Sequence, residues 1–132
     1  QRPPSPSDAG MILRHLAAFL EPAARADGGS LAVEGLGAPE PALTSAPALS
    51  ARLALGAGLL ALIKEGGGTC RLTANEGATE MAGQNGGAVV RFSHQSPRAW
   101  RLGPLVTSTI VAEGIRVREK DGELTLVFPK SR

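Results

Sequence analysis

Residues 102–130 read LGPLVTSTIVAEGIRVREKDGELTLVFPK, and no other stretch says as much about the architecture of the chain. Its first part predicts a helix over 102–113 that stops at Gly114, because glycine readily takes the left-handed conformation with which helices end. Its second part predicts two strands, 115–118 and 124–128. An Asp-Gly pair joins them, and this pair favours the tight turn of a β-hairpin. The stretch is therefore interpreted as a helix followed by a two-stranded hairpin.

Another helix is predicted near the start of the chain. Asp8 is suited to cap it, and the helix is expected to pass a kink at Pro22 and to reach about Asp27, where Gly28 and Gly29 end it. Apolar residues recur at helical spacing on the face expected to be buried: Ile12, Leu13, Leu16, Phe19 and Leu20.

The central helix is predicted over 48–65, after a helix-start pattern at 45–47. Leucine and alanine occupy most of its circumference, and a helix that is apolar all round is normally buried. We therefore expect it to pack against a sheet, with Gly56 and Gly58 allowing close approach. Gly66 is expected to end it.

Alternating apolar and polar residues predict strands at 31–33, 69–75 and 88–93, the last two pairing antiparallel. The glycine- and proline-rich segment 35–47 is expected to be a loop. This order of elements predicts an α/β (α+β) two-layer sandwich, in which about three helices cover one face of a mixed, mostly antiparallel sheet.

The chain has 132 residues, the size of a single domain. The segment 1–9 is rich in proline and serine and lacks apolar periodicity, so it is expected to be a flexible lead-in or linker, with the domain at 10–130. The chain begins at Gln1 and has no Met before Met11. This suggests a fragment or a processed product.

Composition argues against several classes of function. A net charge of +2 and an aromatic content of 3% provide neither a concentrated basic stripe nor a base-stacking platform, so no nucleic-acid partner is expected. Cys70 is the single cysteine, which excludes an internal disulfide and favours a reducing, cytoplasmic location. No apolar run is long enough to cross a bilayer, so no membrane association is expected.

The order of the elements, the helix within 45–68 and an ending of the form LG…G…G…L.FP resemble the ATP-binding domain of histidine kinases. That domain belongs to the histidine-kinase-like (GHKL) fold shared with gyrase, heat-shock and mismatch-repair ATPases. The similarity covers about residues 10–130 and implies the same sandwich. In particular, the chain resembles the C-terminal pseudo-ATPase domain of bacterial histidine phosphotransferases.

The resemblance also implies where ATP-holding residues belong, and the chain departs from the family pattern at each place. Ala61 stands where the family has an Asn that binds the magnesium of the nucleotide, with Ala57 one turn earlier, and alanine has no oxygen for a hard cation. His94 or a neighbour replaces the Asp that contacts adenine. The lid shrinks to 97–102, and the GxGL signature keeps only Gly103. No cofactor and no metal are therefore expected.

Other chemistry-bearing residues have simpler interpretations. His15 invites comparison with a phosphoacceptor, but it lacks an acidic neighbour, so a surface or half-buried role on its helix is favoured. Cys70 is interpreted as a small core residue. Arg98, Trp100 and Arg101 form the best candidate interface with a protein partner, since Trp and Arg are enriched at interfaces. Packing of Trp100 in the core is the alternative.

The function expected from the resemblance is a non-catalytic regulatory or docking domain of a bacterial two-component signalling protein, either a histidine kinase or a histidine phosphotransferase. The expected partner is a response regulator or a kinase, and a homodimer would use a helical region missing from this chain. The alternatives are a partner-switching regulator related to anti-sigma factors, an ATP-binding kinase domain with divergent motifs, and an unrelated α/β domain.

Overall fold

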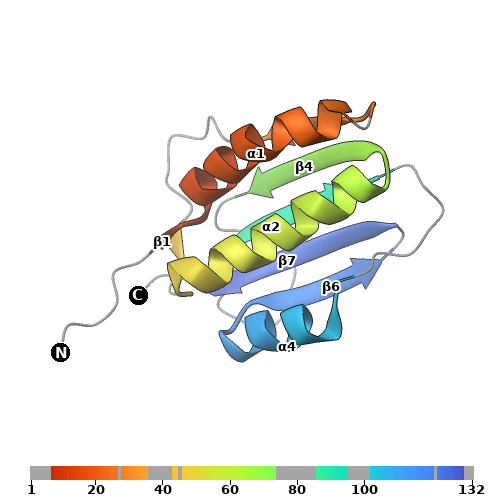
Figure 1. The fold of residues 1–132 in the computed structure, drawn as a ribbon. Coiled ribbons are helices and arrows are strands. Elements are labelled where there is room, and N and C mark those ends of the chain that lie inside the picture. The colour runs from red at the N-terminus through yellow and green to blue at the C-terminus, as the bar shows by residue number, and fades with distance from the viewer. Residues whose placement is uncertain are drawn as a thin grey trace.

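The computed structural model of the chain describes residues 7–26, 28–35, 43–44, 46–73, 86–94, 102–120 and 122–129. Within them, three helices cover one face of a five-stranded sheet, and a two-stranded sheet lies beside the first turns of two of the helices (Figure 1). The helices are α1 (Ala9–Ala26), α2 (Ala48–Lys64) and α4 (Pro104–Ala112). The strands are β1 (Ser7–Asp8), β2 (Ser30–Glu34), β3 (Leu43–Thr44), β4 (Gly67–Thr73), β5 (Gly86–Ser93), β6 (Arg116–Lys120) and β7 (Glu123–Pro129).

The strands of the large sheet are ordered β2-β4-β5-β7-β6. Strands β2 and β4 run parallel, whereas the other described neighbours are antiparallel. The hairpin of β6 and β7 turns at Gly122, whose φ of 77° is the positive value that such turns require. The structure thus confirms the predicted two-layer α+β sandwich with its mixed, mostly antiparallel sheet.

Helix α1 begins as its sequence predicts. Oδ1 of Asp8 accepts hydrogen bonds from the backbone N–H groups of Gly10 at 2.9 Å and Met11 at 3.3 Å, so Asp8 caps the helix. The helix passes through Pro22 and is followed by Gly28, which has a φ of 78°. Both predicted ends of this helix are therefore confirmed.

The expected buried face of α1 contains one error. Leu13 is fully buried, but Phe19 is 79% exposed. Six residues separate the two, which turns Phe19 about 120° around the helix axis from Leu13. The apolar stripe on this helix is wider than the surface that the sheet and α2 can cover.

Helix α2 lies at the centre of the helical layer and supplies most of the helical part of the core. Leu55, Leu59 and Leu62 have no exposed surface. A Cβ added to Gly58 would lie 2.5 Å from Cζ of Phe92 on β5, which confirms the predicted close approach at this glycine. At Gly56 an added Cβ meets nothing within 4 Å, so that glycine is not needed for packing.

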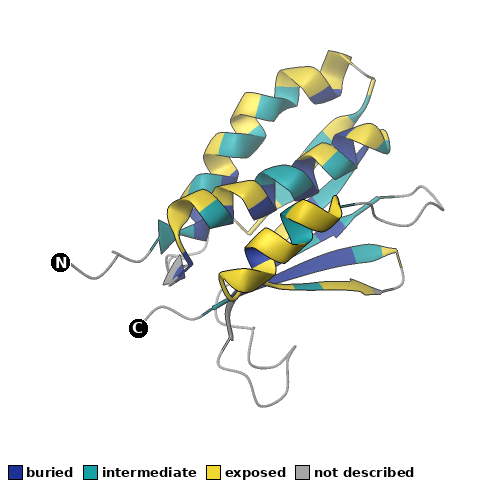
Figure 2. Cartoon of the chain, turned by 60° about the horizontal axis from the view of Figure 1, so that its bottom comes forward, coloured by how far each residue is buried: buried dark blue, intermediate teal, exposed yellow. Residues whose placement is uncertain are grey.

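The outer side of α2 differs from the expectation. The helix packs against the sheet as predicted, but three of its leucines are exposed: Leu49 at 79%, Leu53 at 38% and Leu60 at 51%. The sheet covers one side of α2 and its neighbours α1 and α4 flank it, which leaves the remaining side in solvent (Figure 2). An apolar sequence shows that a face can be buried but not whether a neighbour exists to bury it.

The two-stranded sheet lies in segments that the sequence predicted to be irregular. Ser7 and Asp8 form β1 within the expected lead-in, and β3 interrupts the expected loop of 35–47. Thr44 is fully buried; its Oγ1 donates to the carbonyl of Pro129 at 2.7 Å and accepts from the N–H of Ala46 at 3.1 Å. A single threonine therefore joins the start of α2 to the end of β7.

Candidate functional site

Helices α2 and α4 run in opposite directions along the sheet. The start of α2 lies near Pro129, because Thr44 binds the carbonyl of that residue. The end of α4 also lies there, since an added Cβ on Gly114 would be 3.6 Å from Cγ of Pro129. The first turn of α4 consequently lies at the same end of the layer as the last turns of α2 (Figure 1).

The end of β5 reaches this same region. An added Cβ on Gly68 would lie 2.2 Å from the carbonyl oxygen of Ser93 and 2.8 Å from Cδ2 of Leu62. Ser93 therefore lies beside the last turns of α2, and His94 follows directly. The last turns of α2, the end of β5 and the start of α4 thus lie at the same end of the layer, and these segments carry the predicted pocket positions Ala61, His94 and Gly103.

The side of α2 next to this region is apolar up to the last turn, where Lys64 is exposed on the same side. Ala57 and Ala61 are partly exposed, and Leu53 and Leu60 are exposed on the same side of the helix. We call Leu53, Ala57, Leu60 and Ala61 the α2 strip. It offers no oxygen or nitrogen from a side chain, so it can neither bind a cation nor donate to a phosphate.

His94 is half-buried, and both of its ring nitrogens are shielded from solvent. His94 directly follows β5, which ends at Ser93. The resemblance implies an Asp here, whose carboxylate accepts a hydrogen bond from the adenine amino group. An imidazole does not reproduce that carboxylate.

The start of α4 is poorly suited to receive a phosphate. Gly103 precedes the helix with φ −59° and ψ 143°, and Pro104 is its first residue. Proline has no N–H, so one of the amides that helix starts offer to anions is missing. An added Cβ on Gly103 would meet only Cγ2 of Val106, at 4.0 Å, so this position does not require glycine.

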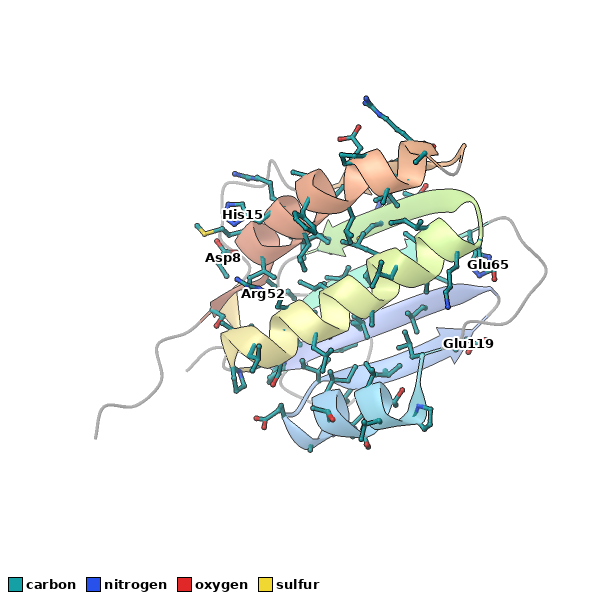
Figure 3. All side chains as sticks on the ribbon, viewed as in Figure 1. Asp8, His15, Arg52, Glu65 and Glu119 are labelled. Carbon is teal, nitrogen blue, oxygen red and sulfur yellow. The ribbon has the colours of Figure 1, made fainter. Side chains whose placement is uncertain are left out.

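The remaining candidate residues lie away from this region or outside the described residues. Figure 3 places the exposed His15 toward the end of the helical layer opposite to Glu65. Cys70 is buried, and desolvation raises the pKa of its thiol from 9.0 to about 12, which opposes a role as nucleophile. The predicted interface residues lie outside the described part of the chain: Arg98, Trp100 and Arg101.

The described residues hold neither a metal site nor a membrane-spanning helix. They contain no group of three or more His, Cys, Asp or Glu side chains that would suit a metal ion. Over the same residues, none of the helices has the length and apolar character needed to cross a membrane.

Sequence reasoning missed the exposure of Leu53 and Leu60. A signal was present, because the polar residues of α2 are only Ser50, Arg52 and Lys64, too few for the polar side that a solvent-facing helix normally has. Such a pattern indicates either complete burial or an uncovered apolar surface, and the packing of α1 and α4 selects the second for this helix.

Comparison with known proteins identifies a fold and no sequence family. No family model matches the chain, and no curated protein matches it in sequence. Among solved structures, the full-length hybrid histidine kinase ShkA in complex with AMPPNP is similar, with a TM-score of 0.61 and 21% sequence identity. The similarity covers 95% of this chain and 30% of the ShkA chain. The chain therefore shares its fold with part of ShkA, and it spans under a third of the length of that kinase.

Proposed function

We propose that this chain is a docking or regulatory domain of a bacterial two-component signalling protein, that it acts in the cytoplasm, and that it does not bind ATP in the usual way. The fold that it shares with part of ShkA supports the class of protein. The α2 strip is the observation that carries the loss of nucleotide chemistry. Ala57 and Ala61 present methyl groups where the resemblance implies polar ligands.

The energetics of phosphate binding support the proposal. A triphosphate with its magnesium loses hydration when it enters a site, and oxygen ligands and N–H donors must replace that hydration. The exposed side chains of Leu53 and Leu60 replace none of it. Entry of a nucleotide into this region would therefore raise the free energy. Covering of the region by an apolar partner surface would lower it.

Nucleotide titration tests this proposal. The chain is titrated with magnesium and AMPPNP in a calorimeter, and full-length ShkA, whose structure contains AMPPNP, serves as the positive control. We expect saturable heat for ShkA and none for this chain at millimolar nucleotide. Micromolar, magnesium-dependent binding would overturn the proposal and favour a divergent ATP-binding domain.

A second measurement tests the docking role. Isotope-labelled protein is mixed with a panel of response-regulator receiver domains and, separately, with sigma factors, while backbone amide resonances are followed. We expect a receiver domain to shift resonances in a contiguous surface. If a sigma factor alone produces such shifts, the partner-switching interpretation replaces the one proposed.

A further inference from the structure

The outer side of the helical layer exposes apolar side chains from two neighbouring helices. The exposed fraction is 79% for Phe19 on α1, and on α2 it is 79% for Leu49, 38% for Leu53 and 51% for Leu60. Helix residues advance by roughly 100° each, so the three leucines lie within about 40° of one another around α2. They form a ridge that points away from the sheet, because the fully buried Leu55 lies on the other side of the helix. We call Phe19 and these three leucines the α1–α2 surface.

Phe19 lies beside this ridge. Helices α1 and α2 run side by side in the same direction, and both begin next to the sheet of β1 and β3 (Figure 1). Phe19, ten positions after the first residue of α1, is therefore level with Gly58, ten positions after the first residue of α2. Glu21 and Arg25 form an exposed ion pair on one flank of α1. Phe19 is on the other flank, one turn after Leu16, which packs against the core, so it faces the side of α2.

The ridge is interrupted at Gly56, where a partner side chain can enter. Gly56 lies one turn after Leu53 and one turn before Leu60, and an added Cβ there would meet nothing within 4 Å. A large apolar side chain of a partner can therefore lie over this glycine and contact a leucine on each side. Contacts of this kind, in which an apolar side chain is fully desolvated, contribute most of the affinity of an interface.

A cation stands toward each end of the α1–α2 surface. Arg52 lies three positions after Leu49, Lys64 lies four positions after Leu60, and both cations are exposed. Figure 3 shows Arg52 on the side of α2 toward α1. The 12 positions between the cations correspond to about 18 Å along the helix axis. The ridge thus has positive charge at both ends.

The described carboxylates leave these two charges unpaired. Helix α2 contains no Asp or Glu, and within the described part of the chain neither Arg52 nor Lys64 forms an ion pair. Oδ1 of Asp8 accepts the hydrogen bonds that cap α1. Glu65 directly follows Lys64, but consecutive helix residues point about 100° apart, so the two do not share a side of α2. An anionic group is therefore missing at each end of the ridge.

Charge argues against the two simplest occupants of this surface. A second copy of the chain would place its own α2 against the first, and that helix brings two cations and no carboxylate. An anionic membrane is matched poorly, because recognition of anionic lipid uses clusters of about four to eight Lys or Arg, and α2 offers two. A partner that carries carboxylates beside an apolar face satisfies both the charge and the ridge.

We propose that the α1–α2 surface binds an amphipathic helix of a partner protein, with a carboxylate at each end of its apolar face. Residues 11 positions apart lie on one face of a helix and about 17 Å apart along its axis, which matches the separation of Arg52 and Lys64. Apolar residues between them cover Phe19 and the leucines. The inference rests on the proposed function in that the chain acts by docking, and it names the chemistry of the partner.

The probe is a fluorescent helical peptide with glutamates 11 positions apart and leucines on the same face between them. It is compared with a peptide that has lysines in place of the glutamates and with vesicles of anionic phospholipid. Binding to the whole chain is followed by anisotropy, and amide resonances locate the contact. Sedimentation measures whether the chain associates with itself.

The variants separate the apolar contact from the charge. Phe19→Ala and Leu60→Ala remove apolar contact, and Leu105→Ala is the matched control, because Leu105 is a leucine of α4 that is 78% exposed. Arg52→Gln removes one charge, and Arg25→Gln is its control on the charged flank of α1. A double variant, Arg52→Glu with Lys64→Glu, reverses the charge at both ends. Circular dichroism verifies that each variant is folded.

We expect the glutamate peptide to shift amides of α1 and α2. Phe19→Ala and Leu60→Ala should each weaken binding roughly fivefold or more, as for apolar contacts at the centre of an interface. Arg52→Gln should weaken binding roughly two- to fivefold, as for one exposed ion pair. The two controls should change nothing, and the charge-reversed double variant should prefer the lysine peptide.

Several results would overturn the inference. These are equal binding of both peptides to the native chain, no reversal of preference in the double variant, or a loss for Leu105→Ala as large as that for Leu60→Ala. Tighter binding to vesicles would identify a membrane as the occupant, and self-association abolished by Leu60→Ala would identify a second copy. If the glutamate peptide does not bind while a receiver domain still shifts resonances, this inference fails and the docking role stands. The nucleotide titration is independent of all these outcomes.

Discussion

Two glycines two positions apart on α2 occupy opposite environments, which permits a matched test of packing. Replacing Gly58 by alanine would bring a methyl group against the ring of Phe92, at 2.5 Å from Cζ, and overpacking of this kind typically costs about 1–3 kcal/mol. Replacing Gly56 by alanine meets nothing within 4 Å and should raise the free energy of unfolding by roughly 0.5–1 kcal/mol, because it removes glycine from a helix interior.

Urea denaturation followed by circular dichroism measures both effects. The two substitutions are chemically identical, so any general effect of adding a methyl group to α2 cancels in the comparison. Equal changes in the unfolding free energy would contradict the contact between Gly58 and Phe92.

Burial of Cys70 makes stability depend on pH at the alkaline end. Desolvation raises the pKa of the thiol from 9.0 to about 12 in the folded chain. Between these values the unfolded chain releases the proton and the folded chain keeps it, so the unfolded state binds fewer protons and stability falls as pH rises. The slope from this one group is at most about 1.4 kcal/mol per pH unit.

The measurement is the unfolding free energy from pH 8 to pH 12 for the native chain and for Cys70→Ala. The chain has no tyrosine, and its lysines titrate alike in both proteins, so the difference between the two curves isolates Cys70. That difference should be constant below the ordinary thiol pKa and should narrow above it. A difference that stays constant over the whole range would show that the thiol is accessible to solvent.

At the scale of elements, adjacent leucines on α2 separate the core side of the helix from its outer side. Leu59 has no exposed surface, whereas Leu60 is 51% exposed. Leu59→Ala should lower the unfolding free energy by about 2–5 kcal/mol, because it leaves a cavity. Leu60→Ala should change it by no more than about 0.5 kcal/mol, as is usual for surface positions.

Thermal and urea denaturation of the two variants check this expectation. They share a helix, a residue type and a substitution, so helix propensity contributes equally to both. A large loss for Leu60→Ala would mean that the α2 strip is covered within the chain, and this would remove the surface offered to a partner.

At the scale of the whole molecule, the order of strands predicts a gradient of local stability. Strands β5 and β7 lie inside the sheet, and β2 and β6 form its edges. Amide hydrogens exchange slowly in strands that are paired on both sides and packed against a core. Edge strands open more easily, so their amide hydrogens exchange faster. Hydrogen exchange should therefore be slowest in β5 and β7 and faster in β2 and β6. Protection of β6 equal to that of β7 would indicate that another segment covers this edge.

The fold was largely accessible from the sequence, and the site was only partly so. The helix over 102–113 and the hairpin after it were predictable because Gly114 and the Asp-Gly turn act locally. Strand β3 was not, since it consists of two residues whose pairing with β1 depends on contacts distant in sequence. That Ala61, His94 and Gly103 belong to one pocket is implied by the resemblance alone. The opposite directions of α2 and α4 place the segments that carry them at the same end of the layer.

The sequence by itself determined where the three helices and the closing hairpin lie, because caps, glycines and apolar periodicity act over a few residues. It also determined that Ala57 and Ala61 cannot bind a cation, since that follows from their chemistry alone. The tertiary structure decided which apolar residues stay exposed, because exposure depends on whether a neighbouring element exists to cover them. It also decided that Phe19 and the exposed leucines of α2 lie on one surface, since only the shared direction of α1 and α2 brings them side by side.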